Sequence, residues 1–404
     1  MTISPWDSVP PGWEVRPLWT EFRRQKVHGD GTEELLSVYR DYGVIPKASR
    51  DDNFNKPSED LTKYQRVSKG DLVVNKMKAW QGSLGISQFD GIVSPAYFVY
   101  KAKGSIDHRY AHYLLRSKAY ADHMAAISSG IRPNQWDLDP TQFAVTPLVV
   151  PPPTLQRAIA DYLDRETAQI DAFIAKNEEL IALLTERRAA VIDEALVRAG
   201  ADSPVTPLKR AVDFVTVGIV VTPAKWYVES GVPALRGVNV KPGSILTDDL
   251  VFLSDQGHRE NRKSELRAGD VLVVRTGQAG AAGVVPPKLD GANAIDLLIV
   301  RTGPKVVPEF LAHFLNSNST SRLIAHGSVG SIQGHFNVGS LRQLPFPQLS
   351  KDEQWALVRM LDEQADRIDR AIGTAVRAIE LARERRAALI SAAATGKIDV
   401  GVAA

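Results

Sequence analysis

The sequence predicts a mixed α/β protein of the α+β class, in which two similar globular domains are joined by two long antiparallel coiled-coil helices. First, the run Glu-Arg-Arg-Ala-Ala-Val-Ile at 186–192 returns as Glu-Arg-Arg-Ala-Ala-Leu-Ile at 384–390, 198 residues later. Second, further identities share this register: Gln156 with Gln354, Leu163-Asp164 with Leu361-Asp362, Ile170-Asp171 with Ile368-Asp369, and Ile174 with Ile372. Third, each half ends in a long stretch of helical periodicity. These matches indicate an internal two-fold repeat.

Length and composition are those of a globular protein with two cores. The 404 residues exceed the usual size of one domain, and the repeat divides them near residue 200. The composition is 44% hydrophobic and 24% charged. A net charge of +2 does not by itself indicate nucleic-acid binding, so any such function must rest on local clusters.

The absence of cysteine excludes disulfide scaffolds, thiol nucleophiles and thiolate zinc sites. No apolar run approaches the ~20 residues that a membrane span needs. The first residues, Met-Thr-Ile-Ser-Pro, lack the basic start and the apolar stretch of a secretory signal. We therefore expect a cytoplasmic protein without membrane contact.

The two globular domains, predicted at residues 1–150 and 201–347, have the same order of elements. In both, β-rich runs bounded by turn residues are followed by helical spacing of apolar residues. The strands and helix are predicted at Leu72–Val74, Ala96–Tyr100 and Tyr110–Met124 in the first domain, and at Val271–Val274, Leu297–Val300 and Pro308–Ala325 in the second. The loops between these elements differ between the copies.

The two spacer helices are predicted at residues 151–200 and 348–404. The prolines at 151–153 cannot continue a strand ladder, and Thr154 behind them is a reasonable N-cap. The equivalent start of the second helix, Ser-Lys-Asp-Glu at 350–353, has the spacing of a capping box.

Each long helix carries an apolar seam with a 4,3 step, which is typical of a coiled coil. The first seam is predicted at Ile159, Leu163, Glu166, Ile170, Phe173, Asn177, Leu180, Leu184, Arg187 and Val191. The second is predicted at Leu357, Leu361, Gln364, Ile368, Ala371, Ala375, Ala378, Ala382, Arg385 and Leu389. Alanines in the second seam face larger residues in the first, which favours an antiparallel pair whose helices stop near Gly200 and Gly396. The alternative is that each helix packs on its own domain or on another protein.

Catalytic motifs are sparse. The chain lacks the GxxxxGK[ST] phosphate loop, and Gly277–Gly283 lacks the GxGxxG spacing. His108 and His112 have the i,i+4 spacing of metal ligands, but no third ligand accompanies them, so we interpret them as helix-surface histidines. The Pro-Pro pairs at 152 and 286 lack the flanking residues with which amino-methyltransferases grip a flipped base. The sequence therefore predicts a non-catalytic chain with no metal and no cofactor of its own.

Polar, glycine-punctuated loops occupy matching places in the two copies. Residues 75–82 and 275–280 each follow a predicted strand, and residues 129–135 and 331–337 come later. Lys and Arg can contact phosphate or guanine, and Gln and Asn can pair with a base edge. The candidate DNA-binding residues are Lys76, Lys78, Gln81, Arg132, Asn134, Arg275, Thr276, Gln278, Gln333 and His335. A solvated turn is the alternative for any one loop, but the recurrence favours recognition loops.

Several segments also carry a family resemblance: Asn75–Gly85, Ser94–Tyr97, Ser129–Trp136, Pro151–Asp164 and the Glu-Arg-Arg helix ends at 186 and 384. Through them the chain resembles, over practically its whole length, the specificity subunits of type I restriction-modification systems. The resemblance implies that the two globular parts are target-recognition domains, each reading one half of a bipartite DNA sequence. It also implies that the helices are the spacer and the docking surface for two modification subunits. The second helix begins with a looser proline pattern at 345–354, so the two docking surfaces are expected to be unequal.

By this resemblance the chain is a non-enzymatic subunit that binds double-stranded DNA. S-adenosylmethionine then belongs to the partner methyltransferase subunits, which flip their own adenines, and restriction or translocase subunits are further candidate partners. The recognition loops are the variable parts of the family, so no target bases carry over. Two alternatives stay open. One is a coiled-coil adaptor with two protein-binding domains, and the other is a methyltransferase, which the missing cofactor motifs disfavour.

Overall fold

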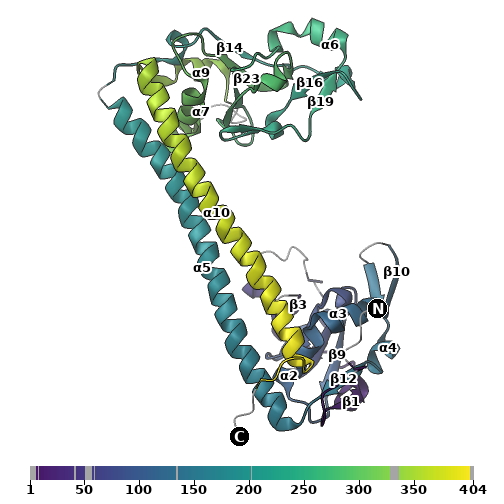
Figure 1. The fold of residues 1–404 in the computed structure, drawn as a ribbon. Coiled ribbons are helices and arrows are strands. Elements are labelled where there is room, and N and C mark those ends of the chain that lie inside the picture. The colour runs from purple at the N-terminus through teal and green to yellow at the C-terminus, as the bar shows by residue number, and fades with distance from the viewer. Residues whose placement is uncertain are drawn as a thin grey trace. The chain divides into compact units, whose positions relative to one another are not determined.

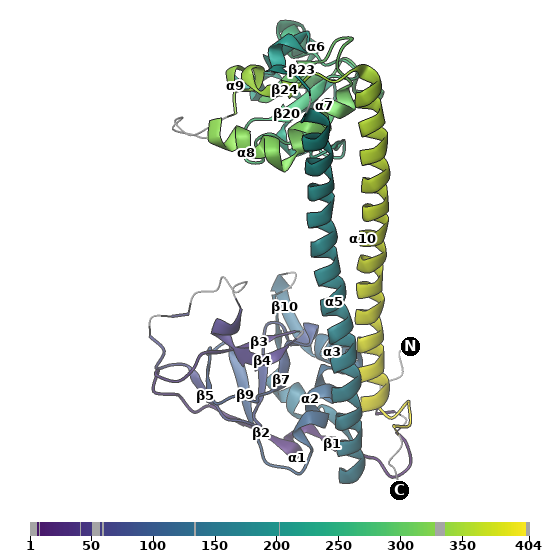
Figure 2. The same ribbon diagram turned by 90° about the vertical axis from the view of Figure 1, so that its left-hand side faces the viewer.

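The computed structural model (Figures 1 and 2) describes residues 6–7, 9–40, 42–50, 57–58, 60–132, 135–201, 203–327 and 336–400. The chain forms two compact units. Unit 1 consists of Met1–Glu178 and Arg377–Ala404, and unit 2 of Glu179–Val376. Each unit therefore combines one globular part with portions of both long helices. The four domain boundaries given above stay predictions.

Unit 1 is built on a four-stranded antiparallel sheet with the strand order β2-β9-β6-β7. The strands are β2 (Phe22–Gln25), β9 (Tyr97–Ala102), β6 (Leu72–Asn75) and β7 (Leu84–Ile86). Leu72, Val73 and Val74 of the inner strand β6 are fully buried. Leu72 and Val74 belong to the main core with the helices, whereas Val73 belongs to a second core with the smaller strands. An apolar run without alternation is what a strand covered on both faces requires.

Short antiparallel pairs surround this sheet: β1 (Glu14–Pro17) with β12 (Pro147–Val150), β3 (Leu36–Tyr39) with β4 (Gly43–Pro46), β5 (Gln65–Val67) with β8 (Gly91–Val93), and β10 (Ser128–Arg132) with β11 (Gln135–Leu138). The short helices are α1 (Leu18–Glu21), α4 (Pro140–Ala144), and the 3-10 helices η1 (Lys47–Ser49) and η2 (Ala79–Gln81). The pair β1–β12 closes the globular part just before the first long helix begins.

Unit 2 repeats the central sheet with the order β14-β23-β20-β21. These strands are β14 (Phe214–Val217), β23 (Leu297–Arg301), β20 (Val271–Val274) and β21 (Ala282–Val284). The pair of β13 (Val205–Pro207) with β24 (Pro345–Pro347) takes the place of β1–β12. The same strand order in both units confirms the predicted repeat.

The insertions of unit 2 differ from those of unit 1. A second sheet joins β15 (Tyr227–Val228), β19 (Val251–Leu253), β16 (Val232–Leu235) and β22 (Asn293–Ala294), and β17 (Val240–Lys241) pairs with β18 (Ser244–Ile245). The short helices are α6 (Asp255–Glu260), α9 (Val338–Gln343), η3 (Leu208–Arg210), η4 (Pro223–Trp226), η5 (Gly237–Asn239), η6 (Arg262–Ser264) and η7 (Pro287–Leu289). The copies thus share a frame and differ in what connects it.

The single helix predicted after each sheet is wrong, because each is a pair of helices: α2 (His108–Arg116) with α3 (Lys118–Ala126), and α7 (Pro308–Asn316) with α8 (Asn318–Gly327). The breaks fall at Ser117 and Ser317, both of which have extended backbone. Each serine ends one helix and its carbonyl oxygen opens the next, with Ala121 N donating to Ser117 O at 3.0 Å. Apolar spacing continues across the break, so periodicity alone does not reveal it.

The long helices are α5 (Pro153–Gly200) and α10 (Lys351–Ala394). The capping box before α10 is confirmed, since Ser350 N donates to Glu353 Oε2 at 2.7 Å and Glu353 N donates to Ser350 Oγ at 3.3 Å. The predicted N-cap Thr154 is wrong. The helix already includes Pro153, where a proline loses no hydrogen bond. At the other ends, α5 stops at Gly200, and Gly396 adopts φ +73° just after α10.

One repeated residue does the same work at the start of both helices. Gln156 is buried, accepts a hydrogen bond from Asp107 N at 2.7 Å and donates to Pro151 O at 2.8 Å. Gln354, also buried, accepts from Val307 N at 2.8 Å and donates to Lys305 O at 3.0 Å. The amide of glutamine can donate and accept at once, so it satisfies buried backbone groups that apolar residues would leave unpaired.

Helices α5 and α10 lie side by side (Figures 1 and 2), and ion pairs within each unit fix their direction. In unit 1, Arg386 pairs with Asp171 at 2.9 Å and Arg383 with Glu178 at 3.1 Å. In unit 2, Arg188 lies 3.4 Å from Asp369. Residue numbers rise along one helix as they fall along the other, so the predicted antiparallel pair is confirmed.

The alternative packing is also present in part, because the ends of both helices belong to domain cores. Ile159 and Leu163 of α5 and Ala393 of α10 are buried in the core of unit 1. Leu196 of α5 and Val358 of α10 are buried in the core of unit 2. Each globular part is therefore completed by one end of each helix. Within the described ranges, no helix is long and apolar enough to cross a membrane.

Half of the predicted seam is wrong. Leu163 and Ile170 are buried as expected, but Phe173 and Leu180 are 48% and 44% exposed. The packed column passes one residue later, through Thr167, Ile174 and Ile181, and in α10 through Ile372 and Ile379 instead of Ala371 and Ala378. Both columns of α5 carry large apolar residues, Phe173 and Leu180 in one and Ile174 and Ile181 in the other, so a 4,3 count fits two registers. The structure buries Thr167 and half-buries Ile174 and Ile181, whereas Phe173 and Leu180 of the other column are exposed.

Candidate nucleic-acid interface

The first candidate recognition loop is a compact turn after β6. Its backbone folds back on itself, with Lys78 N donating to Asn75 O at 3.0 Å. Gly82 ends η2 with φ +81°, a conformation that glycine adopts without strain. Lys78 and Gln81 are exposed. The loop therefore presents two of the predicted contact residues to solvent from a well-defined backbone.

The β10–β11 hairpin packs on this loop and brings two predicted segments together. Leu138 N donates to Lys76 O at 2.9 Å, and Lys76 Nζ lies 3.3 Å from Asp137 Oδ2. The rings of Trp80 and Trp136 lie with their centroids 5.0 Å apart at an interplanar angle of 51°. The loop and the hairpin, far apart in sequence, thus form one surface. Arg132 is the last residue of β10, and Asn134 lies outside the described residues.

The second candidate loop follows β20 at the matching place. Phe336 N donates to Arg275 O at 3.1 Å, which reproduces the bond from Leu138 N to Lys76 O in unit 1. Thr276 and Gln278 are exposed.

A glycine fits this second loop against α8. Gly280 adopts φ +92°, and a Cβ added there would lie 2.8 Å from Ile324 Cδ1. A larger residue would therefore have to displace the end of the Ile324 side chain and adopt a strained backbone conformation. The candidates Gln333 and His335 lie outside the described residues.

Arg275 is held differently from Lys76. Its side chain is 17% exposed and forms an ion pair with Asp296, whereas the side chains of Lys76 and Asp137 are 31% and 57% exposed. Asp296 adopts φ +50°, a left-handed conformation that few residues other than glycine accept. Because Arg275 is already paired with Asp296, a contact between Arg275 and a phosphate or guanine would compete with this ion pair.

Four residues that shape these loops were not among the sequence candidates: Trp80, Trp136, Asp137 and Asp296. The two tryptophans lie inside segments that carry the family resemblance, surrounded by polar residues and glycine. Their presence in polar loops could have indicated a packing contact, since a large aromatic side chain in such a loop usually packs on another residue. The sequence gives no indication that Asp296 pairs with Arg275, because the two residues are 21 positions apart and strand β21 lies between them in the chain.

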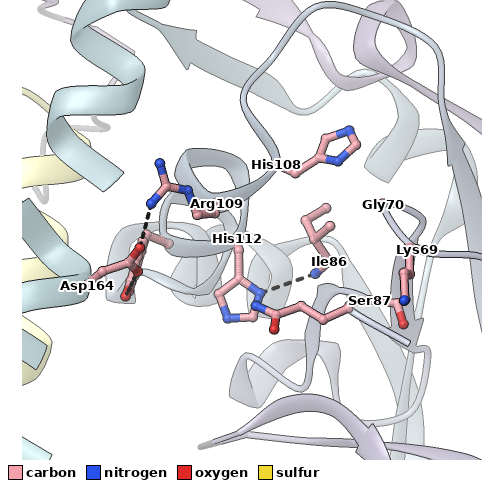
Figure 3. Close-up of a pocket in the computed structure, with 10 residues that line it drawn as sticks. Lys69, Gly70, Ile86, Ser87, His108, Arg109, His112 and Asp164 are labelled. Atoms are coloured by element: carbon pink, nitrogen blue, oxygen red, sulfur yellow. Dashed lines mark hydrogen bonds and ion pairs between the residues drawn. The ribbon is translucent and has the colours of Figure 1, made fainter. Parts of the chain in front are cut away.

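A cavity of about 450 Å³ in unit 1 lies beside the sheet, α2 and α5 (Figure 3). Arg109 pairs with Asp164 at 2.8 Å, and Tyr113 OH donates to the same carboxylate at 2.7 Å. In unit 2, His313 Nε2 lies 2.9 Å from Asp362 Oδ1. Each copy therefore attaches its domain helix to the long helix through the aspartate that the repeat preserves. These contacts explain why Leu-Asp recurs in both helices.

The interpretation of both histidines as surface residues is wrong for His112. Its ring packs on Gly43 and Gly85, where an added Cβ would lie 2.8 and 3.1 Å from His112 Cε1. Burial, together with the charge of Arg116 whose Nη1 lies 2.6 Å from Nε2, lowers the pKa of His112 to about 3. The ring is therefore neutral at physiological pH. Across the residues that the structure covers, no group of three or more His, Asp or Glu side chains is placed to hold a metal ion.

The duplicated α/β unit, the matched polar loops and the antiparallel helix pair define a two-domain coiled-coil protein that presents two related recognition surfaces. The chain is 24% identical over 352 residues to the type I restriction enzyme EcoKI specificity subunit of Escherichia coli K12, covering 77% of this chain and 73% of that protein. It is 22% identical over 408 residues to the StySPI specificity subunit of Salmonella potsdam, with 91% and 86% covered. No family model matches the chain.

Two solved structures share the fold. A chain from a type I R-M system has a TM-score of 0.76 at 16% identity, covering 97% of this chain and 100% of that chain. The HsdS subunit from Thermoanaerobacter tengcongensis has a TM-score of 0.52 at 17% identity, covering 97% and 98%. The chain is thus similar in sequence to specificity subunits of type I restriction enzymes and shares its fold with these two structures, which confirms the resemblance found in its sequence.

Proposed function

We propose that this chain is the DNA sequence-specificity subunit of a type I restriction-modification complex and that each copy reads one half of a bipartite target. The observation that carries the proposal is the matched loop anchor, in which the backbone oxygens of Lys76 and Arg275 accept the same hydrogen bond in the two units. Two loops that share this backbone anchor on equivalent sheets but carry different side chains are suited to two different half-sites. The relatives named above are specificity subunits.

The exposed residues of the loops supply the chemistry of the proposed interface. Lys78 suits a phosphate contact, while Gln81 and Gln278 suit the edge of an adenine, which glutamine can bind through two hydrogen bonds. Lys76 and Arg275 serve as further phosphate or guanine contacts once their ion pairs are shared with DNA. With a net charge of only +2, much of the grip on phosphates falls to partner subunits.

The partners would dock on the long helices. The column that the seam leaves exposed includes Phe173 in unit 1 and Leu180 in unit 2, and Leu183, one turn after Leu180, is 54% exposed. Leu381 of α10 is 66% exposed. Repeated large apolar residues in solvent mark a protein interaction surface. We assign this surface to two modification subunits, which bring S-adenosylmethionine and the catalytic site, and restriction subunits would join the same complex.

The test is selection of bound sequences from a random library by the chain reconstituted with its modification partner. We expect a bipartite preference, and Gln278→Ala should relax one half-site by about 1–3 kcal/mol for a lost bidentate contact while leaving the other unchanged. Gln256→Ala, in α6 and outside the loops, is the matched control. A mutant that weakens all sequences equally would demote Gln278 to a structural role. A wild-type complex with no bipartite preference would overturn the proposed function.

Two other functions make different predictions. A coiled-coil adaptor with two protein-binding domains would show no DNA affinity that falls with salt, whereas a DNA-reading subunit releases counterions and must show it. A methyltransferase would bind S-adenosylmethionine as an isolated chain. Calorimetric titration of the isolated chain with that cofactor separates a methyltransferase from a specificity subunit, and we expect no heat of binding.

A further inference from the structure

We propose that Trp80 and Trp136 form an aromatic clamp that positions the β10–β11 hairpin for reading the first half-site, an inference that rests on the proposed function. The clamp joins the two candidate recognition segments of unit 1. Neither tryptophan needs to contact DNA in this role. Both hold the hairpin in position, so that its other side chains can contact DNA.

The hairpin needs such a clamp because its own sheet has only two strands. β10 and β11 pair with each other alone, and their register is irregular between Ser129 and Arg132. An isolated two-stranded hairpin is marginally stable in water, so packing on another element must hold it in place. In unit 1 that element is the loop after β6.

The hairpin and the loop are joined by an ion pair, a backbone hydrogen bond and the aromatic pair. The ion pair of Lys76 with Asp137 is solvent-accessible and contributes little by itself. The hydrogen bond from Leu138 N to Lys76 O fixes only one point at the base of the hairpin. The rings of Trp80 and Trp136, 5.0 Å apart, fix its orientation, since aromatic pairs add directional attraction to the area that they bury.

Trp80 is the stationary half of the clamp. Its indole Nε1 donates to Met77 O at 3.1 Å, and its neighbour Ala79 is fully buried. The loop is therefore a fixed platform, and Trp136 carries the hairpin onto it. Loss of Trp136 should release the hairpin while the loop keeps its shape.

The second copy has no equivalent pair in its sequence. The match of Lys76 with Arg275 and of Leu138 with Phe336 places Ala279 opposite Trp80, and Gly334 opposite Trp136. Gly334 lies outside the described residues, so this comparison rests on residue type alone. The clamp therefore belongs to unit 1, and its removal should disturb one half-site only.

The experiment uses the full chain reconstituted with its modification partner and compares Trp136→Ala, Trp136→Phe and wild type in sequence selection. Trp136→Ala should lower the preference at one half-site by about tenfold or more per base pair read by the hairpin, and leave the other half-site unchanged. Trp136→Phe should retain most of the preference, because it keeps an aromatic contact. Trp19→Ala, which removes a 52% exposed tryptophan elsewhere in unit 1, should have no effect.

Hydrogen exchange of the full chain without DNA separates the clamp from the proposed function. In Trp136→Ala the amides of β10 and β11 should exchange faster, while those of β6 keep their protection. Unchanged exchange in the hairpin, retained preference at both half-sites, or equal weakening on all sequences would each overturn the clamp. A wild-type complex with no bipartite preference would instead overturn the proposed function and, with it, the role of the hairpin in reading.

Discussion

Units 1 and 2 hold their candidate recognition loops by different means. In unit 1 the loop contacts a separate hairpin through two tryptophans and a solvent-accessible ion pair, whereas in unit 2 the matching loop is tied to the sheet through the more buried pair of Arg275 with Asp296. Around the loops, both units keep the same strand order and the same buried glutamine at the start of the long helix. A duplicated frame can therefore keep its packing while the segments that it presents diverge.

The largest expected effect tests whether the shared frame is equally important in both copies. Leu163 and Leu361 occupy the same repeat position and are 0% and 1% exposed. Leu163→Ala and Leu361→Ala should each lower the free energy of unfolding by about 2–5 kcal/mol, because a buried leucine is lost and a cavity remains. Chemical denaturation of each variant measures the cost. If the two losses of unfolding free energy differ by more than about twofold, one copy contributes more to stability than the other.

Phe173→Ala is the matched control on the same helix. Its side chain is 48% exposed, so its loss should cost less than about 0.5 kcal/mol of folding stability. The same variant should weaken binding of the modification partner if the exposed column is the docking surface. A loss of folding stability as large as that of Leu163→Ala would show that Phe173 packs in the seam, as its periodicity predicts.

The second prediction addresses the ion pairs that distinguish the loops. Arg275→Ala removes an ion pair whose side chains are 17% and 42% exposed, and it should destabilise unit 2 by about 1–2 kcal/mol, because the Arg275 side of the contact is shielded from solvent. Lys76→Ala removes an accessible pair and should cost less than about 1 kcal/mol. Thermal unfolding of the two variants makes the comparison. Equal, small costs would show that the pair in unit 2 is no stronger than the exposed pair in unit 1.

The sequence predicted the frame because the frame is repeated. The register between Gln156 and Gln354 carried over directly into matched buried contacts, and the register between Asp164 and Asp362 into matched contacts with the domain helices. It could not decide between two columns of α5, because Phe173 stands beside Ile174 and both are apolar. Burial is set by the partner helix, which a single helix's pattern does not contain.

The candidate interface was predicted in position but not in detail. Glycine punctuation and polar residues located the loops after β6 and β20, and both were found at matching places. What holds each loop could not be predicted, because Trp136 and Asp296 come from other elements and meet the loops only in the fold. The residues that contact DNA stay predictions, since the contacts within each unit do not indicate which base or phosphate a side chain would bind.

A third prediction concerns a difference inside the shared frame, at the histidine that only unit 1 carries. His112 of α2 packs on Gly43 and Gly85, while Ala312 takes its place in α7. Burial and the charges of Arg116 and Arg386 hold the pKa of His112 at about 3, well below the ordinary value near 6.5. In the unfolded chain the ring binds a proton below pH 6.5, whereas in the folded unit it stays neutral down to about pH 3.

The unfolded state therefore gains protons first as the pH falls, and the contribution of His112 to stability, fully present above pH 6.5, is lost progressively between pH 6.5 and about 3. Between pH 7.5 and 5.5 this loss should be about 1 kcal/mol. Urea unfolding of wild type and His112→Gln at both pH values isolates it, because His123, whose pKa burial also lowers, is present in both proteins and cancels. The pH-dependent loss should be smaller in the variant by that amount. An identical loss in the two proteins would mean that the ring is protonated in the folded unit, and that α2 tolerates a charge where α7 carries alanine.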